Sequence, residues 1–221
     1  MLLYRDRRDA GRKLASRLLR RVGRSAVAVL ALPRGGVPVG YEVARSLGAP
    51  LDVFLVRKLG APGHEELAMG AIASGGVRIL NDDVVEALKI PDEVVEAVAE
   101  REGFELARRE REYRASRPAV PVRERTVILV DDGLATGASM RAAVVGVRRQ
   151  GPARVIVAVP TAARESCHAI EPLVDEVVCA STPEPFFGVG AWYEDFAPTP
   201  DKEVKALLAQ SPTQNLAAPY Q

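Results

Sequence analysis

Cysteine and histidine are scarce in the 221-residue sequence, which contains two of each. The two cysteines, Cys167 and Cys179, belong to no CxxC motif or Cys/His cluster, so we expect neither a disulfide framework nor a structural zinc site. No apolar run approaches the roughly 18 residues that a membrane helix needs, and the charged N-terminal segment lacks the apolar core of a signal peptide. We therefore expect a cytoplasmic protein with no membrane partner.

An excess of either charge is also missing, because 30 basic and 29 acidic residues leave a formal net charge of +1. Nucleic-acid-binding domains usually carry a strong positive excess, so this balance argues against DNA or RNA as a partner. Residues 6–22 have helical spacing of apolar positions and a basic opposite face. We interpret that face as a solvated helix surface, with a nucleic-acid patch as the alternative.

Short apolar stretches alternate with helical patterns along most of the chain. This alternation predicts an α/β fold with a Rossmann-like, mostly parallel sheet flanked by helices, and the length suits one domain. The segment LGAPGHEELAMG (59–70) has loop composition, and two short β-like runs, AIAS and VRIL, follow it. Strands are expected at 26–32, 51–56, 125–130, 154–159 and 176–180, and helices at 37–47, 91–116, 137–150, 164–173 and 201–210.

The stretch VILVDDGLATGASM (127–140) joins a buried strand to a helix through two acidic residues and a run of small ones. Ligands of parallel sheets bind beyond the carboxyl ends of the strands, where helix N-termini offer N–H groups to phosphate. Asp131 and Asp132 would repel the phosphate, but they suit a sugar diol or a hydrated Mg²⁺. A phosphate next to a diol describes a ribose 5-phosphate. The phosphate-binding candidates are Ala135, Thr136, Gly137, Ala138 and Ser139.

This stretch resembles the ribose-phosphate signature of the type I phosphoribosyltransferases: an apolar strand, an acidic pair and a TGxS/T loop. The alternative is a plain strand–helix turn. The resemblance implies 5-phosphoribosyl 1-pyrophosphate as the donor, with Asp131 and Asp132 as catalytic residues. It also implies Mg²⁺ as the cofactor, held near this pair by substrate and water rather than by direct protein ligands. LPRGGVPV, VRKLGAPG and VGAWYxDF also resemble a group of bacterial phosphoribosyltransferases whose acceptor is unassigned.

Two further segments fall where this family binds the pyrophosphate. LPRGGV (32–37) resembles the family's pyrophosphate loop, in which glycines let backbone amides approach the diphosphate and an arginine supplies charge. A plain turn is the alternative. The basic pair after the second expected strand is either a further pyrophosphate contact or an ordinary ion-paired strand end. The pyrophosphate-binding candidates are Arg34, Gly35, Gly36, Arg57 and Lys58.

The 59–70 segment occupies the position of the family's flexible catalytic loop, which closes over the site. Hypoxanthine-guanine members carry an aspartate that handles the base proton where this chain has Ala135, and adenine members have alanine there. The resemblance then implies a loop glutamate near the base. Either Glu65 or Glu66 would act as the acid or base, with His64 as a weaker candidate. The alternative is that these are solvated loop charges.

Residues 183–197 (PEPFFGVGAWYEDFA) gather aromatic side chains. They resemble the hood of the hypoxanthine-guanine group, where a ring stacks on the base. Phe186, Phe187 and Trp192 are the stacking candidates, and the alternative is that these rings form core beneath the hood. The family's purine-reading lysine has no counterpart at 158–161. The sequence therefore leaves the acceptor open between purine and pyrimidine bases.

One domain is expected over residues 1–210, with a core at about 26–180 and a hood at about 181–210, with or without the N-terminal helix. A flexible tail is expected at 211–221, and the resemblance implies a homodimer. Two functions remain open. The first is an Mg²⁺-dependent phosphoribosyltransferase of nucleotide salvage that acts on a nitrogenous base. The second is a non-catalytic regulatory protein that binds phosphoribosyl pyrophosphate or a nucleotide. Arg34 and the charges of the 59–70 segment favour the enzyme.

Overall fold

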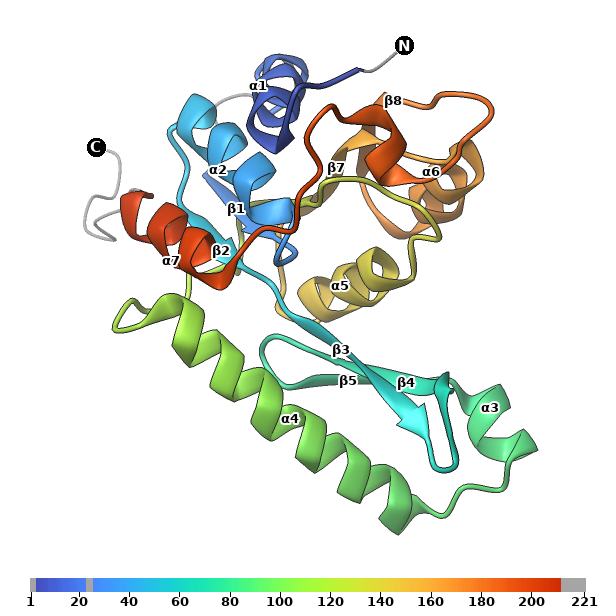
Figure 1. Cartoon of the computed structure of the whole chain (residues 1–221). Coiled ribbons are helices and arrows are strands. Elements are labelled where there is room, and N and C mark those ends of the chain that lie inside the picture. Colours follow the sequence, from blue (N-terminus) through green and yellow to red (C-terminus); the bar gives the residue numbers. More distant parts are fainter. Residues whose placement is uncertain (1–2, 23–25, 212–221) are drawn as a thin grey trace.

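The computed structural model describes residues 3–22 and 26–211 of the chain (Figure 1). The expected tail lies outside the described residues, except for Ser211. Within these two ranges, none of the helices combines the length and the apolar character needed to cross a membrane.

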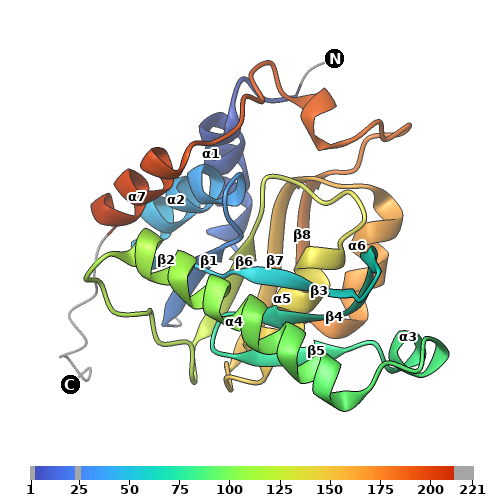
Figure 2. The ribbon, with the colours of Figure 1, turned by 60° about the horizontal axis from the view of Figure 1, so that its bottom comes forward.

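Five parallel strands form the main sheet, in the order β2–β1–β6–β7–β8 (Figure 2). Val29 lies opposite Ile128, and Leu129 lies opposite Val157. Every residue of β1 and β6 is buried because helices cover both faces of the sheet, which confirms the expected α/β fold. The strands are β1 Val27–Ala31, β2 Leu51–Val53, β6 Thr126–Val130, β7 Arg154–Thr161 and β8 Glu176–Ser181.

Helices α1 and α2 cover one face of the main sheet, and α5 and α6 cover the other. Successive strand residues alternate between two cores, so Val29 faces α1 and α2 whereas Leu30 faces α5 and α6. Helix α2 ends at Gly48, whose φ of 62° is the left-handed cap conformation that glycine favours. The helices are α1 Arg7–Leu18, α2 Gly36–Leu47, α5 Ala138–Arg148 and α6 Arg164–Ile170, which the short η1 Glu171–Leu173 extends.

The segment expected to be a loop, residues 59–70, lies in a three-stranded antiparallel sheet, so that expectation is wrong. Leu59 and Met69 are fully buried. Pairing as a hairpin satisfies the backbone while these side chains join the core, which a solvated loop would not allow. The two later β-like runs are confirmed as strands. This small sheet consists of β3 Val56–Ala61, β4 His64–Ala73 and β5 Val77–Leu80.

The long helix α4, Asp92–Arg114, packs on one face of the small sheet, and α5 contacts the other face (Figure 1). Near its C-terminal end, Arg114 donates from Nε to the buried carboxylate of Asp52, at 2.9 Å and 3.0 Å. Helix α4 therefore ties the small sheet to the edge of the main sheet. The remaining helices are α3 Asp82–Ala87 and α7 Asp201–Gln210, and α7 packs against α2 and α4.

The two cysteines are bonded to each other, a pairing that the sequence analysis did not predict. Cys167 of α6 and Cys179 of β8 lie 12 residues apart in the sequence, with Cα atoms 6.9 Å apart. The reason is that α6 packs on β8, which brings two positions together that belong to no recognisable motif. The cysteine residues therefore give no support to the expected cytoplasmic location.

The N-terminal segment pairs with the hood rather than standing apart from it. The N–H groups of Leu3 and Tyr4 both lie within hydrogen-bond distance of the carbonyl oxygen of Trp192, at 3.0 Å and 3.1 Å. The ring centroids of Tyr4 and Tyr193 are 5.3 Å apart. The part of the hood before α7 contains the short helix η2 Val189–Trp192 and lies beside α1 (Figure 1).

Candidate active site

The acidic pair lies at the carboxyl end of β6, directly against the loop that follows β1. A Cβ atom on Gly35 would lie 1.9 Å from Oδ2 of Asp132, and one on Gly36 would lie 2.8 Å from the carbonyl oxygen of Val130. These distances are shorter than real Cβ contacts, so only glycine fits at both positions. The two loops that the sequence predicts to bind the ribose and the pyrophosphate are therefore in contact.

Arg7 of α1 also reaches the acidic pair. Its Nε donates to Oδ2 of Asp132 at 2.8 Å, and only 11% and 16% of the two side chains are exposed. Its Nη1 donates to the carbonyl oxygen of Ala197 at 2.7 Å, and the guanidinium lies 3.9 Å from the ring centroid of Phe196. The hydroxyl of Tyr193 donates to the carbonyl oxygen of Asp132 at 2.6 Å. Helix α1 and the hood thus both hold Asp132 in place.

The two carboxyl groups are electrostatically unequal. Burial raises the pKa of Asp131 well above its ordinary value, and the charge of Asp132 raises it further. Burial also raises the pKa of Asp132, but the hydrogen bond from Arg7 opposes that effect. The charge of Asp131 is compensated chiefly by one hydrogen bond. The backbone N–H of Asp132 donates to Oδ1 of Asp131 at 2.8 Å. This site suits a ligand that brings hydroxyl donors or a cation.

The small-residue loop leads into α5 with Gly137 as the N-cap, at a φ of 73°. The first turn of α5 carries no acidic side chain, so its partial positive charge remains available to an anion. The hydroxyl of Ser166, in the neighbouring helix α6, donates to the carbonyl oxygen of Ala135. The exposed members of the loop are Ala135, Thr136, Ala138 and Ser139.

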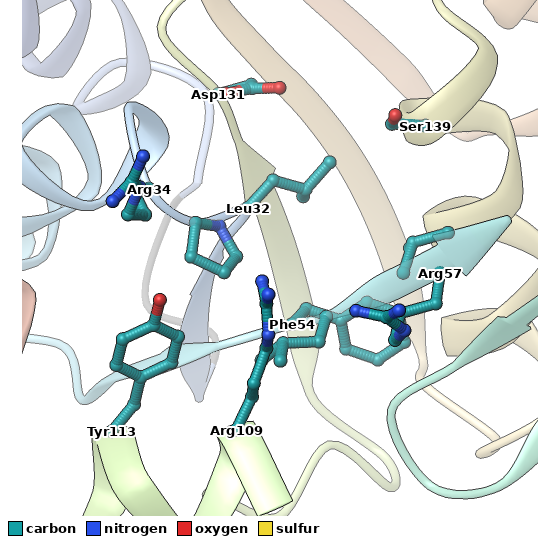
Figure 3. A pocket seen from close by; sticks show the side chains of 11 residues that line it. Leu32, Arg34, Phe54, Arg57, Arg109, Tyr113, Asp131 and Ser139 are labelled. Atoms are coloured by element: carbon teal, nitrogen blue, oxygen red, sulfur yellow. The ribbon is translucent and has the colours of Figure 1, made fainter. Parts of the chain in front are cut away.

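A cavity of about 230 Å³ opens between the end of the main sheet, the start of the small sheet and α4 (Figure 3). Asp131 and Ser139 lie along one side of it. The side chains of Arg34, Arg57 and Arg109 approach from three different elements. The rest of the lining is largely apolar and consists of Leu32, Pro33, Phe54, Leu55, Val56 and Tyr113.

The aromatic residues of the hood do not line this cavity. Phe187 is 76% exposed, and Phe186 is partly exposed. Trp192 packs in the hydrophobic cluster between the hood and the N-terminal segment, where its Nε1 is buried without a partner among the described residues. Besides Tyr193, Val189 of the hood packs against the acidic loop, because a Cβ atom on Gly133 would lie 2.4 Å from its Cγ1.

No group of three or more His, Cys, Asp or Glu side chains in the described part of the chain has a spacing that would hold a metal ion. Asp131 and Asp132 nevertheless offer hard oxygen donors beside a cavity. Such a pair suits a hydrated divalent cation that a ligand also coordinates.

A family model described as the phosphoribosyl transferase domain matches residues 4–194, which is most of the chain. The chain belongs to the phosphoribosyltransferase family. Proteins of two Mycobacterium tuberculosis strains, each named "Putative phosphoribosyl transferase", are 49% identical to it over 208 residues. The match covers 94% of this chain and 47% of each relative, so the chain spans about half the length of these relatives.

Two solved structures share the fold of this chain. The protein TT1426 from Thermus thermophilus is 46% identical, with a TM-score of 0.82 over 94% of this chain and 98% of that one. A hypothetical protein from Neisseria gonorrhoeae, crystallised with ppGpp, is 13% identical, with a TM-score of 0.52 over 95% of this chain and 97% of that one. The second likeness shows the fold alone.

The candidates from the family's catalytic-loop position lie on the β3–β4 hairpin. Arg57 faces the cavity, whereas Lys58, the next residue of β3, donates from Nζ to the carbonyl oxygen of Glu66 at 2.5 Å. The side chain of Glu66 is fully exposed, and His64 lines a separate hollow with residues 88–91. The side chain of Glu65 lies outside the described residues. The structure thus gathers Arg34, Gly35, Gly36, Arg57, Asp131, Asp132 and Ser139 around the site, and places Lys58, His64 and Glu66 away from the cavity.

Arg7, Arg109 and Tyr113 adjoin the candidate site, and sequence analysis missed all three. Arg109 and Tyr113 stand four residues apart on α4, so their shared face could have been read from the sequence. Nothing local shows that this face meets the β1 loop. Arg7 is one of several arginines in α1, and no local pattern distinguishes it from the others.

Proposed function

We propose that this phosphoribosyltransferase transfers the 5-phosphoribosyl group from 5-phosphoribosyl 1-pyrophosphate to a nitrogenous base, with release of pyrophosphate. One observation carries the proposal: the glycine loop, the acidic pair and the start of α5 meet beside one cavity at the carboxyl ends of β1 and β6. The donor has three polar parts, a diphosphate, a diol and a 5′-phosphate. Each part has a chemically matching loop at this site.

In this reaction the bond between ribose C1 and the pyrophosphate oxygen breaks, with the electron pair leaving on oxygen, and a base nitrogen bonds to C1. Asp131 and Asp132 accept hydrogen bonds from the ribose hydroxyls and stabilise the positive charge that develops on the sugar. The guanidinium groups of Arg34 and Arg57, with the N–H groups of the glycine loop, bind the leaving pyrophosphate. The 5′-phosphate is held by Ala135, Thr136, Gly137, Ala138 and Ser139.

Magnesium is the proposed cofactor, because a raised pKa marks Asp131 as a carboxyl group whose charge the protein compensates poorly. Asp131 and Asp132 would hold the hydrated ion through water and substrate oxygens. When bound, the ion neutralises charge on the pyrophosphate. The two aspartates of this chain orient the ribose.

The base is proposed to bind on the hood side, by stacking on Phe186, Phe187 or Trp192. Glu65 or Glu66 is proposed as the acid or base, for which general catalysis is typically worth about 10²–10⁴-fold. Trp192 is the only tryptophan of the chain, so quenching of its fluorescence reports a base that stacks on it. Unchanged fluorescence at saturating base would exclude Trp192 from the base site.

A panel of bases tests the proposed activity. Pyrophosphate release is measured with 5-phosphoribosyl 1-pyrophosphate, Mg²⁺ and each purine or pyrimidine in turn. Turnover with at least one base supports the enzyme. Tight, Mg²⁺-dependent donor binding without turnover of any base would reject it in favour of the regulatory alternative.

Substitution of Asp132 by Asn is expected to lower kcat about 10²–10³-fold, because it removes a charge that stabilises the transition state. Steady-state kinetics measures the loss, and circular dichroism checks that the fold is retained. Asp83→Asn, at an exposed position of α3, is the matched control and should keep full activity. A fully active Asp132→Asn variant would disprove the role assigned to the acidic pair.

A homodimer, a cytoplasmic location and a role in nucleotide salvage complete the proposal. The dimer and the role in salvage are supported by the resemblance to the family alone, and the location by the lack of an apolar run long enough for a membrane helix. Light scattering of the purified chain tests the dimer, and cell fractionation tests the location.

A further inference from the structure

Arg109 is the charged residue of the cavity lining to which the proposed function assigns no ligand contact. It belongs to α4, whereas the donor-binding loops follow strands of the main sheet. Figure 3 shows its side chain rising from α4, beside Tyr113 and near Phe54, toward Leu32 and the β1 loop. A helix outside the main sheet therefore brings a cation into the candidate active site.

The guanidinium group of Arg109 is anchored at one edge only. Its Nε donates to Oε1 of Glu105 at 2.9 Å, and its terminal nitrogens have no acceptor among the described residues. These nitrogens carry four N–H donors. The pKa of Glu105 is lowered to about 2, first by the hydrogen bond from Arg108 and then by Arg109. Glu105 therefore stays ionised and aims the guanidinium without occupying its outer donors.

Carboxylates also support Arg34 and Arg57, in part through terminal nitrogens. Arg57 donates from Nε to Oε2 of Glu102 at 2.6 Å, and Nη1 of Arg34 lies 3.8 Å from Oδ1 of Asp201. The supporting carboxylates lie outside the cavity, and Asp131 is the acidic side chain in its described lining. Three guanidinium groups around one small cavity suit a ligand that carries several negative charges close together.

Helix α4 is a fixed support for Arg109. Tyr113, one turn further on, donates to Oδ1 of Asp201 at 2.7 Å, and Leu106 is buried in the core. The ion pairs Arg57–Glu102 and Arg114–Asp52 hold the helix to both sheets. Arg109 is therefore in place before any ligand arrives, and it needs no loop closure to reach the cavity.

We propose that Arg109 is a diphosphate-binding residue that completes a three-arginine clamp with Arg34 and Arg57. Its terminal N–H groups donate to non-bridging oxygens of the diphosphate. That this diphosphate is the leaving group rests on the proposed function, whereas the binding of diphosphate does not. In this clamp a residue of α4 binds the diphosphate, a contact that would otherwise be expected from the segment at the family's catalytic-loop position, residues 59–70.

Isothermal titration with inorganic pyrophosphate, and separately with ribose 5-phosphate, tests the clamp. Arg109→Gln should weaken pyrophosphate binding about 10- to 100-fold, the usual worth of a charge-assisted hydrogen bond. Arg109→Lys should weaken pyrophosphate binding less, because lysine keeps the positive charge but lacks the planar guanidinium that donates two parallel hydrogen bonds. Ribose 5-phosphate binding and Tm should not change, since Glu105 keeps Arg108 as a partner.

Arg111→Gln is the matched control, because it removes the same charge from an exposed position of the same helix. Its pyrophosphate affinity should equal that of the unmodified chain. The inference is overturned if Arg109→Gln binds pyrophosphate normally, if it loses both ligands equally, or if the unmodified chain binds no pyrophosphate. Arg109-dependent pyrophosphate binding without transfer to any base would reject the proposed function and leave this inference standing.

Discussion

Asp132 is held by a residue 125 positions away in the sequence, Arg7. Burial raises the pKa of Asp132, and the hydrogen bond from Arg7 lowers it. Arg7 is itself fixed by the carbonyl oxygen of Ala197 and by the ring of Phe196. The hydrogen bond from Arg7 therefore favours one orientation of the Asp132 carboxylate. The ionisation of Asp132 in the candidate site therefore depends on the contact between α1 and the hood.

Arg7→Gln tests this dependence. Without the guanidinium the pKa of Asp132 should rise further, so the acidic limb of the kcat/KM profile should move to higher pH. We also expect kcat/KM at neutral pH to fall about tenfold, as for the loss of one charge-assisted hydrogen bond. Arg17→Gln, at an exposed position of the same helix, is the control. A lower kcat/KM with an unshifted pH profile would show that Arg7 acts through folding alone.

Asp131 should make the unliganded protein less stable as the pH rises. Its pKa is raised in the folded state, so its contribution to stability is complete below its unfolded pKa of about 4 and is lost as the pH passes the folded value. Asp131→Asn should therefore raise Tm at pH 7 by a few degrees while it removes activity. The gain should shrink toward pH 4. Thermal unfolding across this pH range measures it, and a variant that is less stable at pH 7 would contradict the argument.

The disulfide joins elements that support the loop proposed to bind the 5′-phosphate, residues 135–139. Helix α6 contributes Ser166, whose hydroxyl donates to the carbonyl oxygen of Ala135, and Cys167 next to it is bonded to Cys179 of β8. The covalent bond thus links α6, the helix that contacts this loop, to β8, the last strand of the sheet. Its effect on stability follows from the length of the segment that it closes.

Replacement of both cysteines by serine should lower the free energy of unfolding by about 3 kcal/mol, the chain-entropy value for a loop of about this length. Urea denaturation of the oxidised protein and of the double variant measures the difference. Reductant should lower the midpoint of the unmodified protein and leave that of the double variant unchanged. Equal midpoints for the oxidised protein and the variant would show that the bond adds no stability.

At the scale of the whole molecule, the cavity lies where two sheets meet. Asp131 follows the main sheet, Arg57 belongs to the small sheet, and Arg109 belongs to the helix that ties the two together. The larger core also includes side chains from both sheets, such as Val29 and Leu59. A ligand that fills this cavity contacts both parts and should stabilise them together.

Donor binding should therefore raise the unfolding temperature in a single transition. At a donor concentration 100 times Kd the gain is about 2.7 kcal/mol, which corresponds to roughly 5–10 °C for a chain of this size. Differential scanning calorimetry with 5-phosphoribosyl 1-pyrophosphate and Mg²⁺ measures the shift. Fructose 1,6-bisphosphate, a sugar with two separate phosphates, is the control. A similar shift with both sugars would mean that the site does not distinguish the donor.

Much of the fold could be predicted because its signals are local. The helix expected at 91–116 runs from 92 to 114, and Gly48 ends α2 as expected. The hairpin could not be predicted in this way, because Leu59 and Met69 are buried against elements that come much later in the chain. The disulfide was missed for the same reason, since its partners meet only when α6 packs on β8.

The sequence by itself determined the alternation of strands and helices and the chemistry of the loops after β1 and β6. The apolar strands, the glycine loop and the acidic pair are local features of the sequence, and parallel strands bring the loops that follow them to the same edge of the sheet. Only the tertiary structure decided that Arg7 holds Asp132, that Arg109 enters the cavity and that Lys58 lies away from it. These placements depend on how α1, α4 and the β3–β4 hairpin pack on the sheet, and that packing involves contacts between distant residues that no local pattern encodes.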